Sequence, residues 1–174
     1  MWSIVETRPP SHRTTNSYLF NLIRKRLKIK HFRGTFPCDL MPRKLSDKQC
    51  IIVNTDPHHS PGAHYIVLYR KLKKYYYFDS LCLDPEMVFP SLHREILARG
   101  FTPLQAVLAK PIQAITSSFC GYFCVDYILT IASPQQALKN SNCYVTDQSN
   151  LLANDRICID NITDYITRNK KRLK

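Results

Sequence analysis

The sequence predicts one α+β domain in which a small mixed or antiparallel central sheet is flanked by helices. Two features indicate this class: short apolar runs bounded by turn formers occupy the middle of the chain, and segments with helical spacing lie on both sides of them. With 174 residues, 44% of them hydrophobic, the whole chain (1–174) has the size and composition of a single soluble domain.

The first part of the chain is predicted to contain an arm, a helix and a connection. Residues 1–14 hold two prolines and many polar groups, which indicates an irregular arm. Helical spacing follows, with Thr15 or Ser17 as the cap and an end before His31; the apolar positions are Tyr18, Leu19, Leu22, Ile23 and Leu27. Residues 31–49, which include several turn formers, are predicted to be a connecting stretch.

Three strands are predicted next. Residues 50–54 are a short apolar run that indicates a buried strand, and residues 55–62 form a loop. Residues 64–69 and 75–78 indicate two further strands, joined by the charged turn at 70–74. Because the link between them is short and polar, these two strands should form a hairpin.

The second half is predicted to be mainly helical. Residues 86–99 indicate a helix ended by Gly100, with one apolar face made of Met87, Leu92, Ile96 and Leu97. Residues 104–112 suggest a fourth strand, residues 120–132 a buried central helix, and residues 157–167 a final helix.

The formal charge of +12, from 25 Lys+Arg against 13 Asp+Glu, favours an anionic partner such as nucleic acid. Basic residues cluster at 24–30, at 70–74 and in a predicted C-terminal tail at 168–174. For any one cluster a solvated surface or a nuclear-import signal is the better explanation, but three clusters shift the balance towards a polyanion. The candidate DNA contacts are Arg24, Lys25, Arg26, Lys28, Lys170, Lys171 and Arg172.

The seven cysteines, with no signal peptide evident before them, indicate a reducing compartment such as the cytosol or nucleus. No apolar run approaches the length of a membrane span, so we expect no membrane partner. The cysteines show no Cys-x-x-Cys spacing, so we expect no metal site and take Cys124 as a core residue.

Cys120 is the candidate nucleophile. If the central helix begins there, the positive end of the helix favours thiolate over thiol, and unpaired backbone N–H groups can hold an oxyanion. Gly121 follows, and its missing side chain leaves room for a substrate carbonyl. For an isolated Cys-Gly pair, a buried structural cysteine is the better interpretation, so the assignment depends on partners.

Three other residues supply those partners. His64 opens a predicted strand, where it could project into a cleft as a general base. Asp79 ends the strand that pairs with it, and the start of one hairpin strand lies beside the end of the other, so Asp79 could orient the imidazole; the alternative role is a turn cap. Gln113, before Cys120, could donate a second hydrogen bond to an oxyanion.

With these four residues in the order His, Asp, Gln, Cys, the chain resembles the adenovirus endopeptidase (adenain) family and the related proteases that process SUMO-like modifiers. The matching segments are Gly62-Ala63-His64-Tyr65, Phe78-Asp79-Ser80, Gln113 and Cys120-Gly121. The run from Cys50 to Thr55 before the loop is also similar, and the specific resemblance covers residues 50–124.

The resemblance implies a thiol protease, a viral-type cysteine endopeptidase that cleaves precursor proteins next to glycine during virion maturation. It implies catalytic roles for His64, Asp79, Gln113 and Cys120, protein substrates, no small-molecule cofactor, DNA as an activator, and a place in the host nucleus and the virion. We also expect a monomer. Family members also use a cysteine for a disulfide to an activating peptide. Thr102 lies near its place and Cys82 is the only cysteine in that interval, which argues against such an activator here.

Two other functions remain open from the sequence. The first is a protease for ubiquitin-like or SUMO-like modifiers, against which the small size of the chain argues. The second is a catalytically inactive nucleic-acid-binding module, with which the basic clusters and ten tyrosines are compatible. Reactivity of the Cys120 thiol distinguishes the second function from both proteases.

Overall fold

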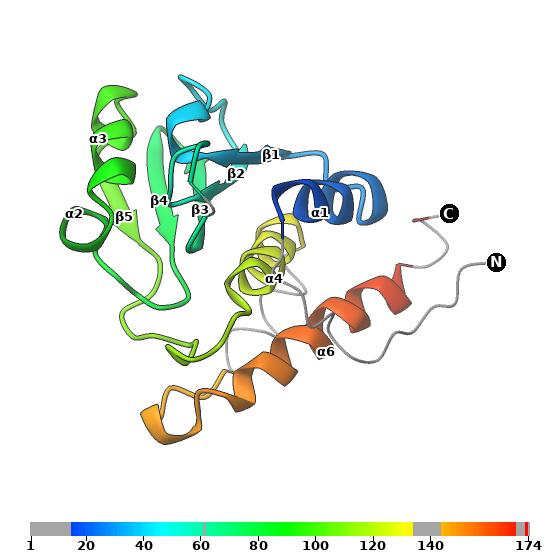
Figure 1. The fold of residues 1–174 in the computed structure, drawn as a ribbon. Coiled ribbons are helices and arrows are strands. Elements are labelled where there is room, and N and C mark those ends of the chain that lie inside the picture. Colours follow the sequence, from blue (N-terminus) through cyan, green and yellow to red (C-terminus); the bar gives the residue numbers. More distant parts are fainter. Residues whose placement is uncertain (1–14, 61, 134–143, 170–172, 174) are drawn as a thin grey trace.

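The computed structural model describes residues 15–60, 62–133, 144–169 and 173. Within these residues, five α-helices surround an open, mixed sheet of five strands (Figure 1). The α+β class and the mixed sheet flanked by helices are therefore confirmed. The predicted arm and most of the predicted basic tail lie outside the described residues.

The middle of the chain forms the central sheet. Its strand order follows the sequence: β1 (Phe32–Pro37), β2 (Cys50–Asn54), β3 (Tyr65–Lys71), β4 (Lys74–Phe78) and β5 (Leu104–Ala106). The three central strands are antiparallel, and each edge strand is parallel to its neighbour. β3 and β4 form the predicted hairpin, with Val67 opposite Phe78, so the segments before β3 and after β4 leave the sheet side by side.

Helices cover both faces of the sheet (Figure 1). On one side lie α1 (Asn16–Phe20), its continuation as the π-helical segment η1 (Asn21–Arg26), and α4 (Cys120–Ala132), with α6 (Ala153–Arg168) packed against α4. On the other side lie α2 (Pro85–Val88) and α3 (Pro90–Ala98).

The core is divided by the sheet into two apolar clusters. Ile52 and Val67 belong to the cluster shared with α4 and α6, whereas Ile51 and Ile66 belong to the cluster shared with α3. Every residue of β2 is buried, and alternate side chains enter the two clusters. A strand buried on both faces has no polar alternation, which explains the continuous apolar run in the sequence.

The predicted helices at both ends of the described chain are confirmed. Thr15 caps α1, because its hydroxyl accepts a hydrogen bond of 3.1 Å from the Tyr18 backbone N–H. The central helix covers the predicted residues 120–132, and the final helix begins at Ala153 rather than at residue 157.

No helix in the described parts of the chain combines the length and apolar character needed to cross a membrane.

The prediction of a simple connection at 31–49 was wrong, because this stretch contains β1 and a 3-10 turn, η2 (Cys38–Leu40). β1 is an edge strand held by parallel backbone pairing to β2, with a register shift between Phe32 and Gly34. Gly34 and Pro37 lower the strand signal in the sequence, but an edge position tolerates both.

The predicted helix at 86–99 is broken in two. Pro90 begins α3, and a proline disfavours the helical conformation in the preceding residue, so Phe89 takes φ −124° and ψ 68°. Leu92 and Ile96 are buried as predicted, but Met87 and Leu97 are exposed, so the predicted apolar face was wrong in half of its members. The predicted strand at 104–112 is only the three-residue β5.

Candidate active site

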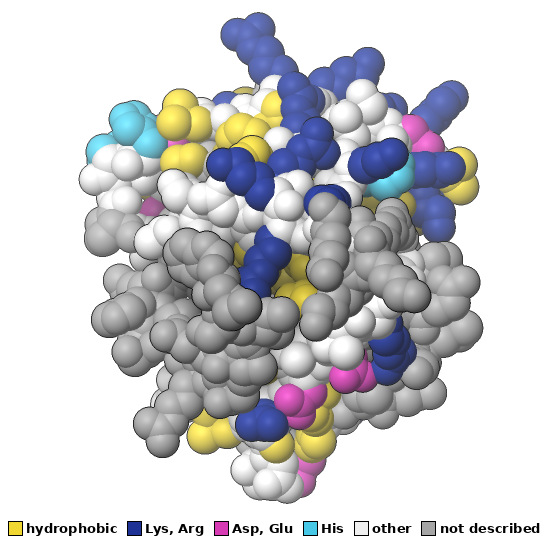
Figure 2. All heavy atoms as spheres, turned by 90° about the vertical axis from the view of Figure 1, so that its right-hand side faces the viewer, with side chains coloured by type: hydrophobic (Ala, Val, Ile, Leu, Met, Phe, Trp, Pro, Cys, Tyr) yellow, Lys and Arg dark blue, Asp and Glu magenta, His cyan; other side chains and the backbone are white. Residues whose placement is uncertain are grey.

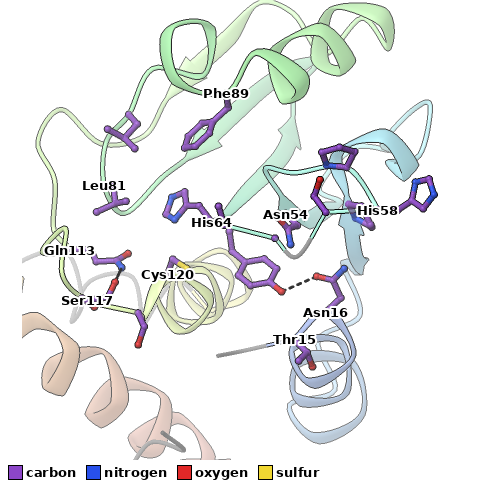
Figure 3. Close-up of a pocket in the computed structure, with 18 of the residues that line it drawn as sticks. Thr15, Asn16, Asn54, His58, His64, Leu81, Phe89, Gln113, Ser117 and Cys120 are labelled. Carbon is purple, nitrogen blue, oxygen red and sulfur yellow. Dashed lines mark hydrogen bonds between the residues drawn. The ribbon is translucent and has the colours of Figure 1, made fainter. Parts of the chain in front are cut away.

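Three of the four residues singled out in the sequence line one cleft, and the fourth, Asp79, lies behind His64. The cleft has a volume of about 620 Å³ and is lined by His64, Gln113 and Cys120. One wall is the loop between β2 and β3, including Gly62 and Ala63. In Figure 3, His64 and Cys120 lie in the middle of the cleft, with Gln113 towards one end and His58 towards the other.

Cys120 is the first residue of α4, at the position where the sequence placed it. The preceding residue, Phe119, provides no side-chain cap to the helix. Among the described residues, no hydrogen bond occupies the backbone N–H groups of Cys120 and Gly121. The thiol therefore lies beside unpaired donors and the positive end of a 13-residue helix, which together favour negative charge on the sulfur or on an adjacent oxygen.

His64 and Asp79 form the expected pair. The distance between His64 Nε2 and Asp79 Oδ1 is 2.6 Å, and both side chains are buried. The carboxylate is fixed by the backbone N–H groups of Leu81, at 2.9 Å from Oδ1, and Leu83, at 3.1 Å from Oδ2. Asp79 thus serves both as the turn cap and as the partner of the imidazole, and Nδ1 is the ring nitrogen left for Cys120.

The charged form of His64 is stabilised by its two neighbours. Burial lowers the pKa of the imidazole, but the hydrogen bonds and charges of Asp79 and Cys120 outweigh it and raise the pKa to about 9. His64 is therefore protonated at neutral pH. An imidazolium between a carboxylate and a thiol is the arrangement in which a thiolate–imidazolium pair can form.

Gln113 is held by three contacts. Its Oε1 accepts a hydrogen bond of 2.6 Å from the Ser80 hydroxyl, and its Nε2 donates one of 2.8 Å to the Ser117 carbonyl. The Ser80 carbonyl in turn accepts the Gln113 backbone N–H at 3.0 Å. Since Nε2 carries two hydrogens, the second is available to a group in the cleft. Ser80 links this amide to the residue next to it in sequence, Asp79.

No protein-family model matches the chain, and a search of the curated proteins finds no match. The assignment of chemistry to this cleft therefore depends on its own geometry.

Phe89 is a site residue that sequence reasoning missed. Its ring stacks on the His64 imidazole, with centroids 5.7 Å apart and an interplanar angle of 19°. Phe89 lies between α2 and α3, 25 residues from His64 in the sequence. The only sequence signal was the Phe-Pro step, which predicts a helix break but not what the aromatic ring contacts. The stack limits rotation of the imidazole ring about the side-chain bonds that join it to the backbone.

We expect Phe89→Ala to lower kcat/KM for peptide cleavage about tenfold, because a misoriented imidazole transfers protons less well. Phe89→Tyr keeps the stack and should retain most of the activity. Rates across pH for both variants check the cause, since loss of orientation lowers kcat at every pH. Equal losses in the alanine and tyrosine variants would show that stacking is not the reason.

The first basic cluster lies on η1 and the residues that follow it. Residues 24–33 hold six Lys and Arg and no Asp or Glu, and Lys25, Arg26 and Lys28 are exposed on η1 and the residues after it. Figure 2 shows Lys and Arg side chains gathered over the upper part of the face that carries α1 and η1. Arg24 also donates to the Lys30 carbonyl at 3.0 Å, which gives it a structural role. Lys170, Lys171 and Arg172 lie outside the described residues.

Proposed function

We propose that this chain is a cysteine endopeptidase in which Cys120 is the nucleophile. The observation that carries the proposal is the line Asp79–His64–Cys120, with a 2.6 Å contact between His64 and Asp79 and the thiol at the start of α4 inside a cleft. A buried structural cysteine needs neither a histidine beside it nor a carboxylate behind that histidine.

In the proposed mechanism, His64 shares or takes the proton of the Cys120 thiol, and Asp79 stabilises the imidazolium. The thiolate attacks the peptide carbonyl carbon, and the oxyanion accepts hydrogen bonds from the Cys120 backbone N–H and the second Nε2 hydrogen of Gln113. His64 gives its proton to the leaving amine, and a thioester forms. Water, deprotonated by His64, then hydrolyses the thioester and restores the thiol.

The resemblance to adenain-like proteases suggests the substrates: precursor proteins of a virus, cut next to glycine during maturation. The loop wall beside His64 contains two small residues, Gly62 and Ala63. Gly62 has φ +79°, and a Cβ placed there would lie 2.1 Å from Asn54 Nδ2, so this wall comes close to the chain behind it. The exposed Lys and Arg residues of η1 support DNA as a partner that concentrates or activates the enzyme.

Selective alkylation of Cys120 tests the proposed nucleophile. At mildly acidic pH, a thiol alkylator should react fastest at Cys120, because burial raises the pKa of every other described thiol: Cys38, Cys50, Cys82, Cys124 and Cys158. Intact mass and peptide mapping measure the site and the rate. His64→Ala should slow the reaction at Cys120 at least tenfold, since the thiolate loses its counter-ion.

The same experiment separates the proposal from the inactive binding module. His31→Ala, which removes an exposed histidine elsewhere, is the matched control and should leave the alkylation rate unchanged. Slow labelling spread over several cysteines would mean that Cys120 is not activated, and would favour a nucleic-acid-binding protein without protease activity. Repeating the labelling with duplex DNA tests the activator role, for which a faster rate is expected.

A further inference from the structure

A second cluster of chemically active side chains lies at one end of the cleft. Asp39, His58 and His59 each offer a ligand atom, and these atoms all lie within 4.8 Å of one another. Asp39 comes from η2 and the two histidines from the loop between β2 and β3. The sequence concealed this group because Asp39 and His58 are 19 residues apart.

The donor set is that of a transition-metal site. Imidazole nitrogen and carboxylate oxygen bind zinc-type ions at about 2.0–2.2 Å, which places neighbouring ligand atoms roughly 3.3 Å apart in a tetrahedral site. Small rotations of exposed side chains bring the three groups to that spacing, since both histidines are exposed and Asp39 is partly so. Three protein ligands leave further positions for water or for another ligand.

The cluster is already partly ordered. Asp39 Oδ2 lies 2.5 Å from His58 Nδ1, and Asp39 Oδ1 accepts the His58 backbone N–H at 2.9 Å. Arg99 donates to the Asp39 carbonyl at 2.9 Å, which fixes η2 against α3. His58 and His59 place their rings 5.3 Å apart.

We propose that Asp39, His58 and His59 bind a divalent transition-metal ion of the zinc type. An ordinary surface ion pair would explain the hydrogen bond between Asp39 and His58. It would not explain why His59 lies close to both of them. The proposal stands on this cluster and does not depend on the protease assignment.

A metal ion bound at this cluster would stabilise the loop that forms one wall of the cleft. The loop that carries both histidines is closed at its ends by the hydrogen bond from Thr55 N–H to the His64 carbonyl, of 2.9 Å, and His58 itself lines the cleft. Its attachments to η2 are the contacts of Asp39 with His58 and the bond of 3.2 Å from Cys38 N–H to the Asp56 carbonyl. A bound ion would also attach His59 to Asp39 and so hold the loop that leads to His64.

Titration with Co²⁺ on the Cys120→Ala variant tests the site without the catalytic thiol. We expect saturable one-to-one binding, with visible d–d absorption bands and no thiolate-to-metal charge-transfer band, because the ligands are nitrogen and oxygen. His58→Ala and His59→Ala should each weaken binding at least tenfold. His31→Ala, which removes an exposed histidine outside the cluster, should not change it.

A second measurement connects the site to the loop. Zn²⁺ should raise the midpoint of thermal unfolding of the Cys120→Ala protein, and the shift should disappear in a variant that also carries His58→Ala and His59→Ala. Unchanged binding in the histidine variants, a charge-transfer band from a cysteine ligand, or no saturable binding would each overturn the proposed site. None of these outcomes bears on selective alkylation of Cys120, so failure of the metal site and failure of the protease assignment are distinguishable.

Discussion

Replacing Cys120 with alanine should abolish peptide cleavage, with a loss of about 10⁵-fold or more in kcat. The remaining groups, His64 and the oxyanion donors, cannot form the thioester by themselves. The measurement is cleavage of a peptide with glycine at the scissile bond, followed by mass spectrometry. Because Cys120 contributes little exposed surface, the substrate should still bind, and the variant should retain affinity for the peptide while losing turnover.

Cys82→Ser is the control for a general effect of cysteine removal. The Cys82 thiol donates to the Leu108 carbonyl at 3.3 Å, and a serine hydroxyl can keep that hydrogen bond. This variant should cleave at the wild-type rate. Cleavage that persists in Cys120→Ala, in a protein whose circular dichroism matches the wild type, would exclude Cys120 as the nucleophile.

The sequence was sufficient to predict the pairing of His64 with Asp79, for a physical reason. The short link of a hairpin fixes the register of its two strands, and a slip of one residue would turn the buried side chains outward, so the ends of the strands are neighbours. Likewise, the start of α4 at Cys120 followed from the apolar run after a polar loop. These parts of the site depend on local periodicity, which a sequence displays directly.

The rest of the site depends on contacts between distant segments, which periodicity does not display. Phe89 reaches His64 only because Pro90 divides the predicted helix, and Ser80 reaches Gln113 across 33 residues. β1 escaped prediction because its stability comes from pairing with β2 rather than from its own side chains. Asp39 contacts His58 because η2 directly follows β1. Since β1 is paired with β2, η2 lies beside the loop after β2.

Asp79→Asn should reduce kcat/KM by about 10³- to 10⁴-fold. The asparagine amide can donate to His64 Nε2 in place of accepting from it, which would leave the proton on Nδ1 and the wrong tautomer facing Cys120. The imidazolium would also lose the carboxylate that stabilises it. Asp160→Asn, which removes an exposed ion pair with Arg156 on α6, is the matched control and should leave the rate unchanged.

The pH dependence of the wild type and of Asp79→Asn gives the second readout. The pKa of His64 is raised to about 9 in the folded protein, from an ordinary value of 6.5. The stabilisation from its charge is therefore complete below pH 6.5 and is lost as the pH rises through about 9. We expect the unfolding free energy to fall across this window, and kcat/KM to decline near pH 9, when His64 no longer carries the proton that the leaving amine requires.

In Asp79→Asn both changes should move to lower pH, because burial lowers the pKa of His64 and only Cys120 is then left to oppose it. The variant should therefore be less stable than the wild type at pH 6 and approach it in stability above pH 9. Urea unfolding at several pH values measures this difference. A gap in stability that does not change between pH 6 and pH 10 would mean that Asp79 acts on the turn at Leu81 and Leu83 and not on the charge of His64.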